Sequence, residues 1–344
     1  MPIHPDRRSI ALLLATAFTV PALLCGCRQE EPTRYRRIPK GAGFIAFVGA
    51  AEHDPLWPIL RAGAERFERN QGLIEVRYVA PAVDSPDQQV ALIRSLVGPS
   101  LRGLCVQVID PAALEPVFDL ARQNGARIVT MIRRTEYPYI DGHVGYDETA
   151  VGSALAEATI QYLRRQGAIA ILHDAGGDRA LRDRYSAFTE AMKPAIGIER
   201  WAEIECGGNP VEVRRTMASF AARYPRLSAW VSIAPWPIME LSPRAVTTAA
   251  SSPLPPGCEL ITCGAEPWVW PFIESGICPL VVGFSYADAG LKALQFCQAA
   301  TESSTIGGRE YMIPIRIVTR GNLDEYRRDW AVWSEPATAA GRRQ

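Results

Sequence analysis

The chain has 344 residues, and its 37 lysines and arginines are balanced by 37 aspartates and glutamates, so the formal net charge is zero. The basic residues are not gathered into one block, which excludes the phosphate-binding stripe of a nucleic-acid-binding protein. We therefore expect no nucleic-acid partner. The length is enough for about two domains, each with a core of its own.

The first residues are typical of a secretory signal. Arg7 and Arg8 precede an apolar run from Ile10 to Leu24. This run has 15 residues and contains Pro21, whereas a membrane-spanning helix needs about 20 apolar residues. We therefore predict a cleaved signal peptide over residues 1–26.

Cys27 follows Leu24 at position −3 and Gly26 at position −1. This is the pattern of a bacterial lipobox, whose cysteine accepts a diacylglyceryl group before cleavage. Cys25 fits poorly, because its −1 residue would be Leu24 and small residues are preferred there. Each buried lipid methylene contributes about 0.8 kcal/mol, so we expect Cys27 to anchor the chain on a membrane surface through a polar tether, residues 27–42. The alternative is an ordinary secreted protein with an incidental cysteine.

From Gly43 onward, short apolar runs alternate with segments of helical period, the signature of repeated βα units around parallel sheets. The first run, Gly43 to Val48, is apolar almost throughout, as in a strand buried on both faces. Ser85, Pro86 and Asp87 supply an N-cap residue, a proline at the first helical position and an acid in the first turn. The predicted helices of this half begin at 55–58, 85 and 111, and its predicted strands are 43–48, 74–79, 104–109 and 127–131.

The same pattern restarts after Asp147, which predicts a second unit of the same architecture. Residues 234–257 contain six prolines, so no helix is placed there with certainty. The sequence predicts helices at 148–166, 182–192, 210–223 and 286–300, and strands at 168–172, 199–204, 229–233, 259–263, 280–283 and 312–318. The expected fold class is α/β, with two doubly wound Rossmann-like lobes built on parallel sheets.

Residues for catalysis, metals or cofactors are not arranged in known motifs. The histidines lack ligand spacing, no G-x-S-x-G elbow occurs, and Gly176-Gly177 does not begin a phosphate loop. His53 beside Asp54 is too little for a metal site. We predict no enzyme activity, no cofactor and no metal. Six further cysteines lack the close pairs of a zinc site. An exported chain permits disulfides between them, and their connectivity is left open. These cysteines are Cys105, Cys206, Cys258, Cys263, Cys278 and Cys297.

Five fragments, taken in their order and spacing, resemble one known family. They are Phe47–Trp57, Ile128–Arg133, His143–Asp147 followed by Gly152, Arg182–Phe188 and Tyr224–Val231. The family is that of the ribose- and galactose-binding type I periplasmic solute-binding proteins, which shares its fold with the ligand domains of LacI-type repressors. The resemblance covers Gly43 to Val318. It implies two lobes joined by a three-stranded hinge, with crossings near Tyr146, Phe284 and Val318.

The resemblance also implies lobe boundaries and ligand contacts. The N-terminal lobe would comprise 43–146 and 284–317, the C-terminal lobe 147–283 and 318–333, and the tail 334–344. Asp54 stands where the family places a polar contact, and Leu56 and Trp57 stand where it places aromatics against a sugar ring, whose C–H face suits stacking. Trp57 as a plug at the helix start is the alternative.

Two arginines match family positions that bind ligand hydroxyls, Arg133 in one lobe and Arg182 in the other. A guanidinium offers five donors in a rigid fork, suited to paired hydroxyls, a carboxylate or a phosphate. Surface positions in solvent are the alternative for both.

The second half departs from the family pattern. An Asn-Asp pair is replaced by Ala234-Pro235 before Trp236, and an aspartate by Gly264, with Glu266 two residues later. We include Trp236 and Glu266 among the expected ligand residues. The expected cleft is rich in donors and short of acceptors, which favours an anionic sugar derivative unless Glu266 replaces the lost aspartate.

The resemblance implies a monomeric solute-binding lipoprotein of the periplasm or cell surface, which captures a sugar, polyol or similar small ligand for an ABC permease. A binding protein that presents its closed form to a sensor kinase or chemoreceptor is the alternative, because both tasks use the same closed conformer. A scaffold that has lost sugar binding is a further one. A repressor is excluded, because a signal peptide and tether occupy the place of its DNA-binding domain.

Overall fold

The computed structural model describes residues 43–71, 75–174, 179–243, 253–303 and 308–335. The predicted signal peptide, Cys27 and the tether lie outside the described residues, as does nearly all of the predicted tail. No helix within the described ranges is long and apolar enough to cross a membrane.

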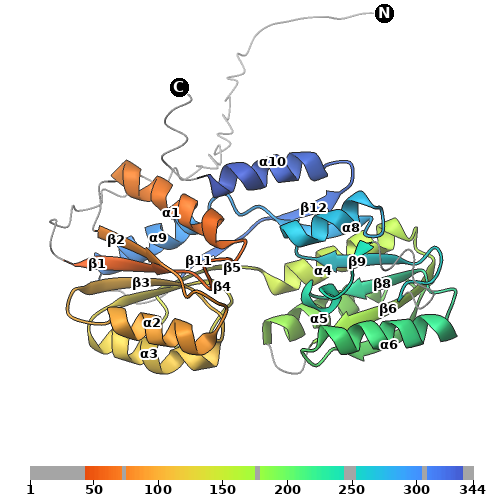
Figure 1. Cartoon of the computed structure of the whole chain (residues 1–344), viewed down its shortest axis with the longest axis horizontal. Coiled ribbons are helices and arrows are strands. Elements are labelled where there is room, and N and C mark those ends of the chain that lie inside the picture. Colours follow the sequence, from red (N-terminus) through yellow and green to blue (C-terminus); the bar gives the residue numbers. More distant parts are fainter. Residues whose placement is uncertain (1–42, 72–74, 175–178, 244–252, 304–307, 336–344) are drawn as a thin grey trace, which may run out of the picture. The chain divides into compact units, whose positions relative to one another are not determined.

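The first sheet has six parallel strands in the order β11-β5-β4-β3-β1-β2. Its strands are β1 Phe44–Val48, β2 Glu75–Val79, β3 Leu101–Gln107, β4 Arg127–Ile132, β5 Gly142–Gly145 and β11 Arg309–Met312. Helices cover both faces, with α1 and α9 on one side and α2 and α3 on the other (Figure 1). These helices are α1 Trp57–Gln71, α2 Pro86–Leu96, α3 Pro111–Gln123 and α9 Ala289–Thr301. Cover on both faces explains why β1 is buried at every position.

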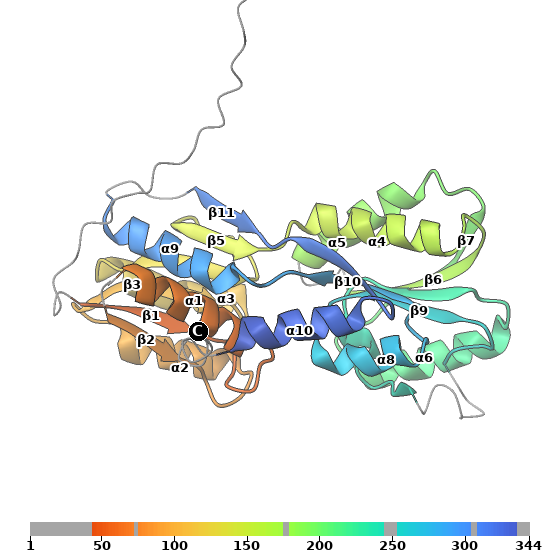
Figure 2. The same ribbon diagram turned by 90° about the horizontal axis from the view of Figure 1, so that it is seen from above.

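The second sheet repeats this design in the order β12-β10-β9-β8-β6-β7, with only the β10–β12 pair antiparallel. Its strands are β6 Gly167–His173, β7 Ile198–Glu205, β8 Ala229–Ser232, β9 Glu259–Cys263, β10 Leu280–Phe284 and β12 Ile315–Thr319. The helices are α4 Glu148–Tyr162, α5 Arg179–Met192, α6 Pro210–Arg223 and α8 Trp270–Glu274. Figure 2 shows α4 and α5 on one face and α6 and α8 on the other. The two doubly wound α/β lobes expected from the sequence are therefore confirmed.

Gly152 permits the close packing of α4 on α5. A Cβ at this position would lie 2.1 Å from the backbone oxygen of Arg184, so any larger residue would push the two helices apart.

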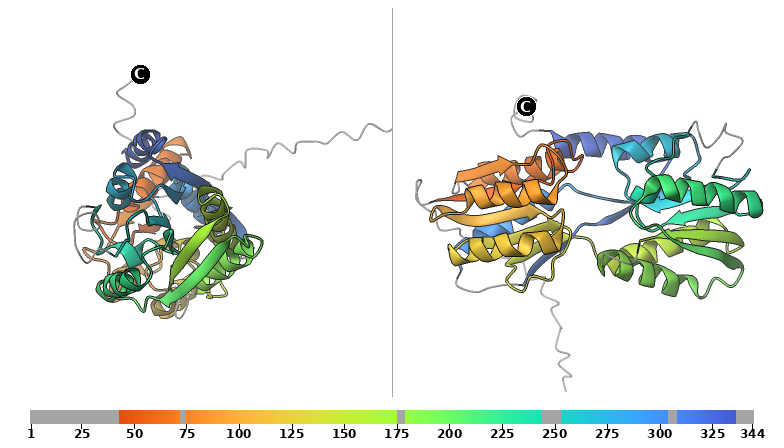
Figure 3. Two further views of the ribbon diagram at one scale, coloured as in Figure 1. Left: turned by 90° about the vertical axis from the view of Figure 1, so that its right-hand side faces the viewer. Right: turned by 60° about the horizontal axis from the view of Figure 1, so that its bottom comes forward.

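The chain passes between the sheets three times, after β5, after β10 and between β11 and β12. Figure 3 shows these connecting segments running between the two sheets. The single late strand predicted from Met312 to Val318 is wrong, because two strands occupy this stretch, β11 and β12, and they belong to different sheets. Ile313 and Pro314 separate them, so the third crossing lies there and not near Val318.

Helix α10, Leu323–Ser334, follows β12 and packs against α1 as well as β12. Tyr326 donates its hydroxyl to the carbonyl of Phe284 at 3.1 Å. Trp330 meets Tyr286 edge to face with ring centroids 5.7 Å apart, and it meets Trp270 at 5.9 Å. The helix therefore contacts α1 of the first half, and its aromatic side chains contact α8, β10 and Tyr286 directly after β10. Figure 2 shows it running from α1 to α8.

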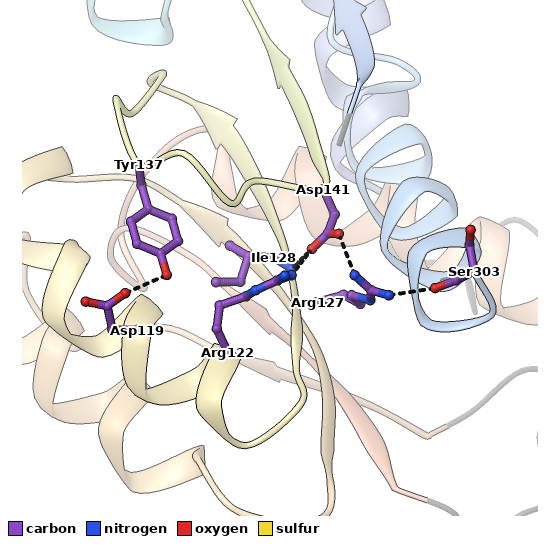
Figure 4. Close-up of polar contacts among 7 residues, drawn as sticks. All are labelled: Asp119, Arg122, Arg127, Ile128, Tyr137, Asp141 and Ser303. Carbon is purple, nitrogen blue, oxygen red and sulfur yellow. Dashed lines mark hydrogen bonds and ion pairs between the residues drawn. The ribbon is translucent and has the colours of Figure 1, made fainter. Parts of the chain in front are cut away.

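A buried carboxylate fixes the stretch that leads from β4 to β5. Asp141 is 1% exposed and accepts hydrogen bonds from Arg122 at 2.9 Å, Arg127 at 3.2 Å and the backbone N–H of Ile128 at 2.8 Å. Arg127 also donates to the carbonyl of Ser303 at 2.6 Å. Figure 4 shows Asp141 holding residues of α3 and β4, and Arg127 in turn reaching Ser303, which follows α9.

The six cysteines of the described part are all buried and are not joined by disulfides. Cys105 and Cys263 lie within β3 and β9, where the sequence places them in apolar strands.

Candidate functional site

A cleft of about 1210 Å³ lies between segments of the two sheets. The first half lines it with Asp110–Ala112 after β3 and with Ile132–Glu136, which run from the last residue of β4 into the following loop. The second half contributes Arg179–Asp183 of α5 and Trp236, and the first crossing contributes Tyr146–Thr149. The loops that follow β3, β4 and β8 lie at the carboxyl ends of parallel strands, where open α/β sheets bind their ligands.

Three of the predicted ligand residues line this cleft: Arg133, Arg182 and Trp236. Arg133 is exposed and donates from Nη1 to the carbonyl of Ile109 at 2.6 Å. Arg182 is an exposed residue near the start of α5, on the opposite half. Trp236 begins a short 3-10 helix, Trp236–Ile238, and is partly exposed. The structure thus brings the two predicted arginines to one cleft from different sheets.

The other residues predicted in the first half do not line this cleft. Asp54 accepts the backbone N–H of Leu56 at 2.7 Å and thereby fixes the start of α1. Burial raises the pKa of Asp54. Leu56 is 6% exposed and Trp57 is 8% exposed, and the Trp57 ring stacks on Phe47 with centroids 6.1 Å apart. The stacking of Trp57 on a ligand stays a prediction.

Glu266 also lies away from the lining, directly before the short 3-10 helix Pro267–Val269. Its Oε2 atom is buried and has no hydrogen-bond partner among the described residues. Burial and, to a smaller extent, the charge of Asp54 together raise the pKa of Glu266 to about 7. Asp54 of the first half and Glu266 of the second half are therefore close enough to interact electrostatically. Nearby, the hydroxyls of Tyr146 and Tyr286 lie 2.9 Å apart.

Acidic side chains line the cleft together with the arginines, although the resemblance to the family predicts a cleft that is short of acceptors. The acids of the lining are Asp110, Glu136, Asp147, Glu148, Asp174 and Asp183. One of them joins the halves directly, since Glu136 accepts a hydrogen bond from Arg179 at 2.8 Å. The cleft therefore offers acceptors as well as donors, and it is not the acceptor-poor site that the sequence predicts. The signal for these acids was their position after strand ends, as for Asp110 and Asp174.

Arg184 lies two residues after Arg182 and has a different role. It is 6% exposed and pairs through Nε with Glu148 at 2.7 Å, while Nη1 donates to the carbonyl of Ile233 at 3.0 Å. The buried Arg184 therefore compensates the negative charge of Glu148, which lines the cleft.

No group of three or more histidines, cysteines or acids that could hold a metal ion occurs in the part of the chain that the structure describes. His53 instead has its Nδ1 3.3 Å from the carbonyl of Ala82.

Comparison with known proteins adds a family and a set of similar folds. The model of the periplasmic binding protein domain matches residues 45–303. No curated protein matches the chain significantly.

Several solved structures share the fold at low identity. A solute-binding protein of an ABC transporter from Burkholderia graminis, in complex with D-arabinose, has a TM-score of 0.70 and 16% identity over 85% of this chain and 99% of that one. A sugar-binding protein of a sugar ABC transporter from Bacillus halodurans has a TM-score of 0.72 and 17% identity over 83% and 99%. An arabinose-binding protein from Geobacillus stearothermophilus has a TM-score of 0.71 and 16% identity over 84% and 99%.

The matched stretch contains both sheets except β11 and β12, the strands on either side of the third crossing, and it contains nearly all of the cleft. By its sequence over this stretch, and by a two-sheet architecture shared with solute-binding proteins, the chain belongs to the periplasmic binding protein domain family.

Proposed function

We propose that this chain is an extracytoplasmic solute-binding lipoprotein that captures a sugar or sugar-like ligand between its lobes and delivers it to an ABC importer. One observation carries the proposal: a family match over residues 45–303 surrounds a cleft into which both halves bring an arginine, Arg133 and Arg182. The structural neighbours that bind D-arabinose or belong to sugar transporters support the ligand class. A binding protein acts by closing around its ligand, so the task needs no catalytic residues.

The chemistry of the cleft favours a neutral polyhydroxylated ligand over an anion. Guanidinium groups donate to hydroxyl oxygens, and carboxylates accept hydroxyl protons, so paired donors and acceptors suit groups that do both. The lining holds six acids against four arginines, and this excess of negative charge disfavours a carboxylate or phosphate. A sugar or polyol meets both sets without carrying charge.

Membrane attachment is part of the same proposal. The lipobox that ends at Cys27 would hold the chain on a membrane, with residues 28–42 as the tether. Fractionation of cells that carry Cys27→Ser tests this, because the variant should leave the membrane fraction while the wild type stays.

Thermal unfolding of residues 28–344 against a ligand panel tests the binding function. The panel holds D-arabinose, D-fucose, D-tagatose, sugar phosphates and small carboxylates. A ligand that binds only the folded state stabilises it by about 2.7 kcal/mol at one hundred times its Kd. We expect a shift with a neutral sugar that disappears in Arg133→Ala and persists in Arg200→Ala, an exposed arginine outside the cleft.

A shift with sugar phosphates or carboxylates alone would overturn the preference for neutral ligands. No shift across the panel would contradict capture of these sugars. An unchanged shift in Arg133→Ala would place the ligand elsewhere.

A further inference from the structure

Ile132, the last residue of β4, has an unusual backbone conformation at the edge of the cleft. Its φ is +68°, and the N–H of Arg133 donates to the carbonyl of Met131 at 2.9 Å across it. A bond from residue i+2 back to residue i around a positive φ defines the γ-turn that is rare and strained. A β-branched residue in this region is an outlier, because its side chain crowds the backbone.

The neighbouring strands hold this turn in place. The carbonyl of Met131 also accepts the N–H of Val108 at 3.2 Å. On the other side, Ile132 pairs with Gly145 of β5, and a Cβ at Gly145 would lie 2.8 Å from the carbonyl oxygen of Ile132. Backbone packing on both sides therefore enforces a conformation that isoleucine alone would avoid.

Glycine would adopt this turn without steric cost. Isoleucine at such a position costs stability, and strain of this kind gathers at ligand sites where the side chain is needed. The Ile132 side chain is partly exposed and lines the cleft directly beside Arg133. An apolar side chain and a hydrogen-bond donor thus occupy consecutive positions of the cleft lining.

We propose that Ile132 is a specificity-determining residue, whose side chain presents an apolar surface to the C–H or methyl face of the ligand beside the donors of Arg133. The inference rests on the proposed function and narrows its ligand class. A sugar whose polar edge meets Arg133 and whose carbon face meets Ile132 is preferred over one with an additional hydroxyl on that face. The stability lost in the strained turn is the cost of this preference.

The strain is tested without any ligand, by comparing the melting temperatures of Ile132→Gly and Ile132→Ala. At an ordinary position alanine is the more stabilising residue, because glycine loses more backbone entropy on folding. At Ile132 we expect the glycine variant to melt higher than the alanine variant, by about 2 °C or more. An alanine variant that melts as high as the glycine variant would contradict the strained turn and with it the inference.

The specificity is tested with D-fucose and D-galactose, two sugars that differ only by a methyl group in place of a hydroxymethyl group. Calorimetric titration of the wild type should give a preference for D-fucose of roughly threefold to tenfold. Ile132→Asn keeps a residue that tolerates positive φ but is polar, and it should abolish this preference. Leu120→Ala, on α3 outside the cleft, is the matched control and should leave it unchanged.

The outcomes separate the two proposals. Binding of both sugars with an equal ratio in the wild type and in Ile132→Asn would overturn the role of Ile132 and leave the proposed function standing. Absence of binding of either sugar to the wild type would contradict the proposed function for such sugars and the inference together.

Discussion

A single buried carboxylate, Asp141, organises the polypeptide between β4 and β5. It accepts from two arginines, Arg122 and Arg127, that are less than one fifth exposed. Removal of one partner from a buried ion pair leaves the other charge without compensation. We expect Asp141→Ala to lower the free energy of unfolding by about 3 kcal/mol, measured by urea denaturation.

The control for this prediction is the exposed pair between Arg77 and Glu75, whose side chains are 47% and 60% exposed. Glu75→Gln should change the free energy of unfolding by less than about 0.5 kcal/mol. Equal effects of the two substitutions would show that the Asp141 contacts do not stabilise the fold.

Glu266 makes stability depend on pH in a definite direction. Its pKa is about 7 in the folded protein, against an ordinary value of 4.5, because burial disfavours its charge. Between these values the folded state binds more protons than the unfolded state, so stability falls as pH rises through this window. Glu266→Gln should therefore raise the melting temperature near pH 8 and have little effect near pH 4.

The comparison must be made between variant and wild type at each pH, because His143 acts in the opposite sense. Burial lowers the pKa of His143 to about 4 from 6.5, so its contribution to stability falls as pH drops through that range. A constant gain for Glu266→Gln at all pH values would mean that Glu266 is not a buried titrating group.

Among the secondary-structure elements, helix α10 stabilises the fold through the packing of its aromatic side chains. Trp330 is 6% exposed and touches Tyr286 and Trp270, whereas Val332 on the same helix is 59% exposed. Trp330→Ala should lower the free energy of unfolding by about 3–5 kcal/mol, since truncation of a buried aromatic leaves a cavity. Val332→Ala should change it by less than about 0.5 kcal/mol, and similar losses from both would contradict this account of the helix.

Most elements could be predicted because their sequence signals are local. Apolar runs such as 43–48 and cap residues such as Ser85 predict strands and helix starts from a few neighbouring residues, and β1 and α2 begin where these signals stand. Strand β5 is not among the predicted strands, because it has only four residues and two of them, Gly142 and Gly145, are glycines, which are depleted in strands. The sequence predicts one strand over 312–318 where the structure has β11 and β12, because an apolar stretch does not show which sheet it joins.

The candidate site was less predictable, because it depends on where side chains point. Arg133 follows the end of β4 and Arg182 lies near the start of α5, and both reach the cleft. Leu56 and Trp57 lie between β1 and α1 and at the start of α1, yet they are turned into the core. The conformation of Ile132 could not be predicted at all, since its sequence favours an ordinary strand and only packing against β3 and β5 enforces the turn.

For the whole molecule, the proposed capture of a ligand between the lobes would be favoured by contacts that cross the cleft. The pair between Glu136 and Arg179 spans it at 2.8 Å, with both side chains largely exposed. Ligand affinity is reduced when the binding-competent form is less populated, even if no ligand contact is lost. Glu136→Ala should weaken ligand binding by less than about fivefold, and high salt should erase the difference.

Calorimetric titration at two salt concentrations measures this effect. Glu203→Ala, which breaks the exposed pair with Arg200 within the second half, is the control and should bind ligand like the wild type. Weaker binding that persists at high salt would indicate a direct ligand contact by Glu136.

The six buried thiols have a consequence for the proposed export of the chain. An exported protein meets thiol oxidants while it is still unfolded, when cysteines that are later buried are exposed. Folding and oxidation therefore compete, and the outcome depends on which is faster. Once folding has buried them, the same cysteines are inert. The rate at which an alkylating reagent at high concentration labels them then reports how often the native protein opens.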